Sequence, residues 1–226
     1  MAALFDARAK MYGLLAGLYR KELEFDQIDE LKHAKFPVGT GNETTDKGFR
    51  LMYEYLSSAW EGSVTELKVD YSRTFIGSGV SGYSAAYPYE SVYTSDRRLL
   101  GREARGEVLQ YYRNNNLTKG RWNDMEDHIA LELEFMQILS GRVRDSFNRD
   151  DEEAALNDIR CQRDFIRNHL NNWLPMISGD MLKFAQTKFY QGLAMVTLGY
   201  CEDDEQLLDE ILDGAPEAPV ELRMEM

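Results

Sequence analysis

The sequence contains little cysteine and little histidine, and each shortage excludes a class of site. Its 226 residues include two cysteines, Cys161 and Cys201, which form no C-x-x-C pair. With only three isolated histidines beside them, a zinc site is not expected, because structural zinc takes four clustered ligands. The two cysteines are most simply explained by a reduced cytoplasmic protein without disulfides.

Long hydrophobic runs are missing as well. No window approaches the roughly 18 uncharged apolar residues that a membrane-spanning helix needs. The first residues, 1–6, lack a basic segment followed by an apolar run, so we expect no signal peptide. These absences predict a protein that stays in the cytoplasm and does not insert stably into a membrane.

Positive charge is scarce. The chain has 26 Lys and Arg against 39 Asp and Glu, a formal net charge of −13. Nucleic acid is therefore not an expected partner, since phosphate binding needs clustered cations. The negative charge would attract a cationic partner, or it could serve solubility alone. The 43% hydrophobic and 12% aromatic content indicates a folded globular protein.

Apolar residues recur at helical spacing along most of the chain, and no segment alternates as a strand would. This pattern predicts an all-α fold, a single bundle of about ten helices. A capping box is expected at residues 63–66, and Pro175 is expected to end a helix. The later helices are placed near residues 97–111, 127–139, 156–170, 181–198 and 201–212.

The helical domain is expected to occupy residues 1–213, with a loose tail at 214–226. Residues 114–123, rich in asparagine, form either a hinge between two halves or an ordinary helix connection. Residues 77–89 carry several glycines and serines and predict a long loop, and such loops are often functional.

Enzyme motifs are incomplete. Residues 77–82 match G-x-G-x-x-G, but the segment before them is predicted to be helical, whereas a dinucleotide site needs a strand there. No P-loop is present, and E-x-x-H occurs once, at 30–33, where a di-iron bundle needs two copies. We therefore assign no catalytic residue, no metal ligand and no cofactor from the residues.

Asp127 and His128 stand at the start of a predicted helix that opens with acidic residues. Asp127 could complement the helix dipole while His128 packs as a partly buried residue. Alternatively, Asp127 could pair with an arginine of a partner, and His128 could tune the local charge. The aromatic residues of 71–93 could belong to the core or line a groove that binds a peptide.

Five segments together carry a resemblance to a known family: residues 70–77, 87–93, 99–101, 127–136 and 165–170. In these segments and their order, the chain resembles the TorD/DmsD family of redox enzyme maturation chaperones, with NarJ as a more distant branch. The resemblance implies a cytoplasmic all-helical chaperone. Such a chaperone binds the twin-arginine signal peptide of a molybdopterin-containing oxidoreductase and assists its cofactor insertion and assembly before export.

The resemblance also implies site residues. Those associated with signal-peptide binding fall on Asp127, His128, Tyr71, Phe75, Pro88, Tyr89, Ser91 and Tyr93. Members are not enzymes in the usual sense, although weak guanine-nucleotide binding is associated with some of them. A monomer or a domain-swapped dimer is implied. The chain departs from the family pattern at Glu126, where a proline often precedes the Asp-His pair.

Two other functions remain open at this point. One is a nucleotide-binding or nucleotide-hydrolysing enzyme that uses the Asp127–His128 region. The other is a helical scaffold that binds the folded partner without reading a signal peptide. The sequence does not name the client oxidoreductase.

Overall fold

The computed structural model describes residues 1–79, 84–95, 100–101, 103–120 and 122–215. Regular structure in these residues is helical, which confirms the all-α prediction. The α-helices are α1 (Ala2–Arg20), α2 (Phe25–His33), α3 (Glu43–Ser57), α4 (Ser63–Tyr71), α5 (Glu90–Thr94), α6 (Glu103–Asn114), α7 (Ile129–Asn148), α8 (Glu152–Phe165), α9 (Asn171–Phe184) and α10 (Lys188–Asp213). Two π-helical turns, η1 (Ser72–Ile76) and η2 (Ile166–Leu170), continue α4 and α8.

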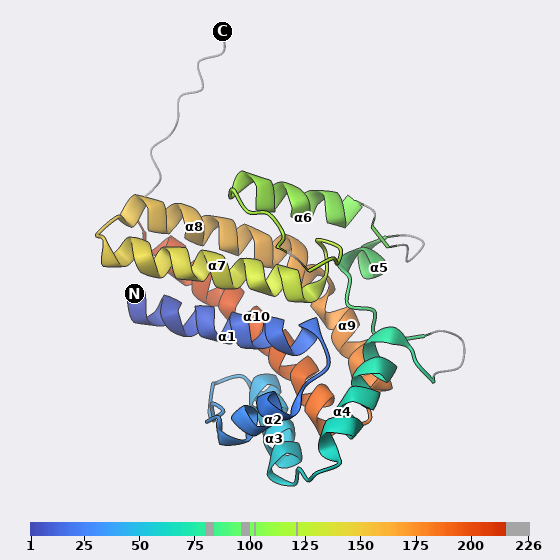
Figure 1. The fold of residues 1–226 in the computed structure, drawn as a ribbon. Helices are drawn as coiled ribbons and strands as arrows, with labels where there is room; N and C mark the ends of the chain where they lie inside the picture. Colours follow the sequence, from blue (N-terminus) through green and yellow to red (C-terminus); the bar gives the residue numbers. More distant parts are fainter. Residues whose placement is uncertain (80–83, 96–99, 102, 121, 216–226) are drawn as a thin grey trace.

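Two long helix pairs organise the bundle. Helix α1 packs along α7, and α3 packs along α10, while α8 lies beside α7 and α9 beside α10. In Figure 1, α10 runs behind α1, and α2 and α3 lie below α1 in the view. The α3–α10 crossing is very close: a Cβ atom added to Gly48 would lie 2.7 Å from the Gly192 carbonyl oxygen. Glycine at these positions is therefore a packing requirement.

A buried carboxylate fixes the corner between α9 and α10. Asp70, near the end of α4, accepts hydrogen bonds from the backbone N–H groups of Gln186 (2.9 Å) and Thr187 (2.8 Å). It also accepts one from the Thr187 hydroxyl at 2.6 Å. Asp70 thus satisfies backbone donors that the break between the two helices leaves without helical partners.

Two of the sequence-based boundaries in the C-terminal half are wrong. Helix α9 passes through Pro175, directly after the π turn η2, and ends at Phe184. The two helices expected at 181–198 and 201–212 are one helix, α10. Gly199 does not end a helix there, because it lies against α3, where a Cβ would meet the Thr45 side chain and backbone.

The expected capping box at the start of α4 is also wrong. Gly62 is the N-cap, and no side chain caps the helix. The Ser63 hydroxyl instead accepts a hydrogen bond from the Trp60 N–H at 3.0 Å, and Glu66 accepts one from Tyr55 at 2.7 Å. Both side chains are engaged by the preceding helix and turn, so neither reaches the orphan N–H groups of α4.

Three other predictions concern segments that lie next to, or partly outside, the described residues. Helix α6 begins at Glu103, six residues after the expected start near 97, and residues 96–99 and 102 lie outside the described part. Residues 114–123 connect α6 to α7, and Asn116 has the left-handed conformation there, with φ of 55°. Of the tail expected at 214–226, residues 216–226 lie outside the described part.

Candidate functional site

His128 forms the N-cap of α7. Its ring Nδ1 accepts a hydrogen bond from the Ala130 N–H at 3.1 Å, and its carbonyl oxygen accepts one from Leu131 at 2.8 Å. A nitrogen that accepts carries no proton, so the cap needs a neutral imidazole. Burial lowers the pKa of His128 to about 4, against the opposing effect of Asp124. The neutral form is therefore the one present near pH 7.

Asp127 caps a different helix. Its Oδ2 accepts a hydrogen bond from the Ser91 N–H at 3.1 Å, in the first turn of α5. Its backbone carbonyl accepts one from the Glu90 N–H at 3.0 Å. Adjacent residues of the Asp-His pair thus hold the beginnings of two helices, α5 and α7. This explains their pairing without any direct bond between the two side chains.

The loop before α5 lies antiparallel to residues 127–129. The Ile129 N–H donates to the Pro88 carbonyl at 3.0 Å, and Tyr89 and His128 form an isolated β-bridge. The structure therefore brings together the two sequence segments that the family resemblance singled out. Ser91 completes the junction, because its hydroxyl accepts a hydrogen bond from the Gly101 N–H at 3.0 Å.

The Asp-His pair itself is hidden from solvent. The exposed fraction of Asp127 is 0% and that of His128 is 3%. Two half-buried aromatic rings stand edge-on to the imidazole: Tyr89 at 5.0 Å and Trp122 at 4.8 Å between ring centres. The Arg20 guanidinium, from the end of α1, lies over Trp122 at 5.1 Å. The accessible surface here consequently belongs to the aromatic rings and not to the pair.

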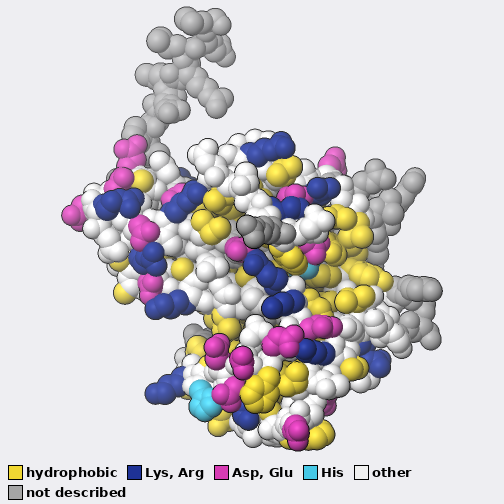
Figure 2. Space-filling model, viewed as in Figure 1, with side chains coloured by type: hydrophobic (Ala, Val, Ile, Leu, Met, Phe, Trp, Pro, Cys, Tyr) yellow, Lys and Arg dark blue, Asp and Glu magenta, His cyan; other side chains and the backbone are white. Residues whose placement is uncertain are grey.

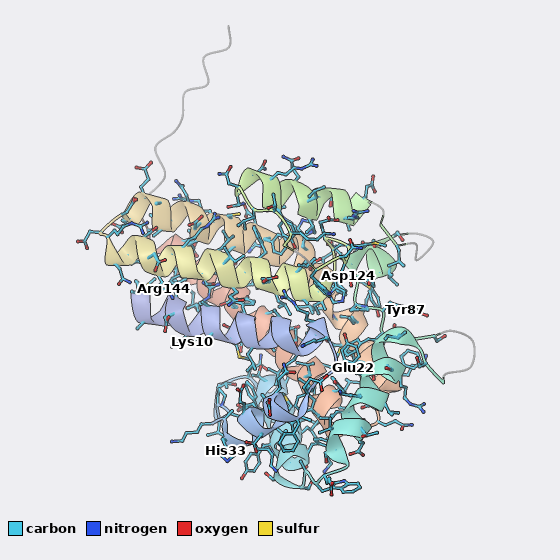
Figure 3. The ribbon with its side chains drawn as sticks, in the orientation of Figure 1. Lys10, Glu22, His33, Tyr87, Asp124 and Arg144 are labelled. Carbon is cyan, nitrogen blue, oxygen red and sulfur yellow. The ribbon has the colours of Figure 1, made fainter. Side chains whose placement is uncertain are left out.

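Half-buried acidic side chains border these rings. The Tyr89 hydroxyl donates to Asp124 at 2.8 Å, and Glu22, just after α1, accepts a hydrogen bond from Ser72 at 2.9 Å. Figure 3 shows Glu22, Tyr87 and Asp124 around the region between the end of α1, the start of α7 and η1. Hydrophobic side chains gather on the same part of the surface in Figure 2. The region combines an aromatic and apolar floor with carboxylates at its border.

The other expected site residues lie around this region at different depths. Tyr71 and Phe75 are buried with their rings 4.9 Å apart, and the Tyr71 hydroxyl donates to the Tyr19 carbonyl at 3.0 Å. Burial and the hydrogen bond to Asp124 raise the pKa of Tyr89, and the charges of Asp124, Asp127 and Tyr71 add to this rise. Tyr93 points elsewhere: its ring stacks on Trp173, and its hydroxyl donates to Asp180 at 3.3 Å.

A buried acid network beneath α5 escaped the sequence analysis. His169 Nδ1 lies 2.9 Å from an oxygen of Glu90, and the Trp173 indole donates to Glu132 at 3.2 Å. Burial, together with the nearby charges of Glu90 and Asp127, raises the pKa of Glu132 well above its ordinary value. One sequence feature could have indicated that Glu132 is buried: it lies three residues after Ile129, in the apolar stripe of α7.

Glu126 stands where the family resemblance implies a proline, and it has a structural role of its own. Its carboxylate pairs with Arg105 at 2.5 Å and with Lys119 at 3.2 Å. Burial opposes its ionisation, but these cations hold the pKa of Glu126 below its usual range. The Tyr112 hydroxyl also donates to its carbonyl at 3.0 Å. These contacts tie α6 to the segment that leads into α7.

The described residues lack the features of a metal site and of a dinucleotide site. No group of three or more His, Cys, Asp or Glu side chains there is arranged to hold a metal ion. Gly77 follows the π turn η1 and not a strand, so the start of the G-x-G-x-x-G match lacks the context of a dinucleotide site; residues 80–82 lie outside the described part. None of the helices found in the described ranges is long and apolar enough to cross a membrane.

Comparison with known proteins decides the family. Residues 42–178 match the family model described as nitrate reductase delta subunit. The chain belongs to this family. Its relatives include chaperone protein TorD of a Vibrio cholerae serotype O1 strain, 28% identical over 216 residues, which cover 92% of this chain and 95% of the relative.

Two further TorD proteins extend the comparison. That of Vibrio atlanticus is 27% identical over 91% of this chain and 96% of its own length. That of Shewanella piezotolerans is 25% identical over 90% of this chain and 93% of its own length. The resemblance to the TorD/DmsD family that the sequence segments indicate is therefore confirmed for nearly the whole chain.

Proposed function

We propose that this TorD-family protein is a cytoplasmic chaperone for the catalytic subunit of a molybdopterin oxidoreductase. In this role it binds the twin-arginine leader of that subunit and assists cofactor insertion and assembly before export. The names of the relatives support the chaperone role. The observation that carries the leader-binding part is the junction of Asp127 and His128 with the loop of Tyr89, which holds an aromatic surface beside carboxylates.

The side chains best placed to pair with leader arginines are Asp124 and Glu22. Asp127 is fully buried, and one of its oxygens is occupied by the Ser91 N–H. Asp124 and Glu22 are half-buried at the border of the aromatic surface. Carboxylates match the planar fork of a guanidinium, and aromatic faces attract its charge.

The remaining parts of the surface suit the rest of such a leader. An apolar stretch follows the arginines, and the exposed parts of Tyr89 and Trp122 offer it an amphipathic aromatic floor. The net charge of −13 would speed the encounter with a cationic peptide. Asp127 and His128 act by positioning: they fix the loop and the helix that present Tyr89.

Titration calorimetry with a synthetic leader tests this proposal. The leader with two arginines and the same peptide with two glutamines are titrated into the full chain. Asp124→Asn and Glu22→Gln should each weaken binding of the arginine leader by about fivefold, as expected for one partly exposed charge-assisted hydrogen bond. Neither substitution should alter the residual binding of the glutamine leader.

A matched control separates local pairing from net charge. Glu210→Gln removes the same charge from an exposed position near the end of α10, and it should leave leader affinity unchanged. If neither leader binds, while the mature subunit without a leader is still captured, the protein is a scaffold for the folded partner and the leader proposal fails.

A further inference from the structure

Two arginines of the described chain lie over aromatic rings, and they differ in exposure. Arg8 is buried over Phe5, and Asp204 accepts two hydrogen bonds from its guanidinium, of 2.6 and 2.7 Å. Arg20 lies over Trp122, with 5.1 Å between the guanidinium carbon and the ring centre. The Arg20 side chain is 34% exposed. The guanidinium of Arg20 is therefore at the surface, within reach of another molecule.

Two side chains hold the Arg20 guanidinium, and we call them the cradle. Trp122, in the connection between α6 and α7, supplies a ring face. Glu134, in the second turn of α7, accepts a hydrogen bond from Nη2 of Arg20 and is itself 36% exposed. A guanidinium suits both partners, because its plane stacks on an aromatic face and its N–H groups match a carboxylate.

The cradle holds Arg20 incompletely. Nε of Arg20 is buried and has no hydrogen-bond partner among the described residues. A buried donor without a partner is costly, and water would supply the partner if the side chain turned outward. The pair with Glu134 adds little stability, since both side chains are partly exposed. Arg20 is the last residue of α1, so the side chain can leave the cradle without breaking a helix interior.

The cradle adjoins the surface assigned to the leader. The Trp122 ring stands edge-on to the imidazole of His128, with 4.8 Å between ring centres. Burial is the main reason that the pKa of His128 is low, and the charges of Asp124 and Arg20 act on it in opposite directions. Asp124 and Arg20 are therefore both within electrostatic reach of one ring. Glu134 is a further carboxylate of this surface, and Arg20 occupies it.

We propose that the cradle is a binding site for one arginine of the leader, and that Arg20 is its internal competitor. The inference rests on the leader binding proposed above. Without a leader, Arg20 fills the cradle. When a leader binds, one of its arginines takes the place between Trp122 and Glu134, and Arg20 turns to solvent. The competition lowers leader affinity, which suits a chaperone that has to release its client.

Methylguanidinium ion tests the cradle without any leader. Arg20→Ala empties the cradle, and Arg20→Ser, an equally small replacement, is measured beside it so that the result does not depend on the folding of one variant. At about 50 mM, methylguanidinium should raise the midpoint of thermal unfolding of both variants by about 1–3 °C relative to methylammonium at the same concentration. The unaltered chain should show no such difference, because Arg20 fills its cradle.

Leader titrations then test the competition. Three synthetic leaders, which differ only in carrying two arginines, two lysines or two glutamines, are titrated calorimetrically into the unaltered chain and Arg20→Ala. The substitution should strengthen binding of the arginine leader at least about fivefold more than binding of the lysine leader, because an ammonium group lacks the planar fork. Binding of the glutamine leader should not change.

Arg167→Gln is the matched control for net charge. It removes the same charge from a side chain that is 45% exposed and pairs with Glu205 and Asp209 of α10. It should leave the affinity for all three leaders unchanged.

Three outcomes would overturn the proposal. Equal midpoints in methylguanidinium and methylammonium for both small variants would mean that the cradle has no site for a guanidinium. An equal gain for the arginine and lysine leaders would mean that Arg20 only repels cations. Weaker binding of the arginine leader to Arg20→Ala would make Arg20 a support of the surface. If methylguanidinium stabilises the small variants but no leader binds to any chain, the guanidinium site is supported and the proposed leader binding is what fails.

Discussion

Glu132 provides the sharpest test of the acid network under α5. Replacement by glutamine keeps the shape of the side chain and imitates the protonated acid. The amide NH₂ can donate toward Glu90, and the amide oxygen can still accept the Trp173 indole N–H, as Glu132 does at 3.2 Å. The residue has no exposed surface, so the substitution changes protonation chemistry with little change in packing.

The effect on stability depends on pH, and its sign follows from the raised pKa. The folded state keeps a proton on Glu132 that the unfolded chain releases above about 4.5. The free energy of unfolding therefore falls as pH rises above that value, by up to about 1.4 kcal/mol per pH unit, until the folded-state pKa is reached. Glu132→Gln removes this loss, so the variant should become more stable than the parent as pH rises.

Urea unfolding followed by circular dichroism, at intervals from pH 4 to 8, measures the difference. His128 has the opposite dependence, because its folded pKa of about 4 makes stability fall as pH drops below 6.5. Subtracting parent from variant cancels that contribution, and Glu90, Asp127 and His169 remain in both chains. Glu210→Gln, at an exposed site, should show no such trend. A variant-minus-parent difference that stays constant with pH would refute the reasoning.

Three other predictions concern packing, capping and charge. Gly48→Ala should lower the free energy of unfolding by about 1–3 kcal/mol because the added Cβ meets α10. Gly141→Ala has open space around the added Cβ and should raise the free energy of unfolding by about 0.5–1 kcal/mol. Thermal unfolding of both variants checks these two expectations. His128→Asn should keep the α7 cap and remain about 1 kcal/mol more stable than His128→Ala in urea; equal stability would mean that the cap is unimportant. Asp204→Ala should cost about 3–5 kcal/mol by leaving Arg8 buried and unpaired, and the double change Arg8→Met with Asp204→Leu should recover most of it; a double variant as unstable as the single one would contradict this.

The periodicity of apolar residues predicted the fold class, but it did not predict several of the helix boundaries. Helical spacing of apolar residues located α1 because that helix buries one face. It also located α7, although the first two turns of α7 are buried on all sides. Gly199 lies between the two helices expected at 181–198 and 201–212. Its actual role, close contact with α3, depends on a residue 154 positions away (Thr45), which no local pattern reports. Pro175 similarly sits within a helix once a π turn precedes it.

The site followed from the sequence in part. The family segments indicated Asp127, His128 and Tyr89, and the structure joins them through backbone hydrogen bonds between residues 88–90 and 127–129. The sequence could not reveal that the pair is buried and caps two helices, because capping of α5 by Asp127 is a long-range contact. Nor could it distinguish Asp124 from the many other acids, since that depends on the bond to Tyr89.

The most direct test of the leader surface is photo-crosslinking. Benzoylphenylalanine replaces Tyr89 in one full-length chain and Tyr53 in another. Tyr53 is 60% exposed on α3 and serves as an accessible aromatic position away from the Asp127–His128 junction. With a labelled twin-arginine leader, irradiation should give a covalent adduct at position 89 and none at position 53. An adduct at position 53 with none at 89 would contradict the account.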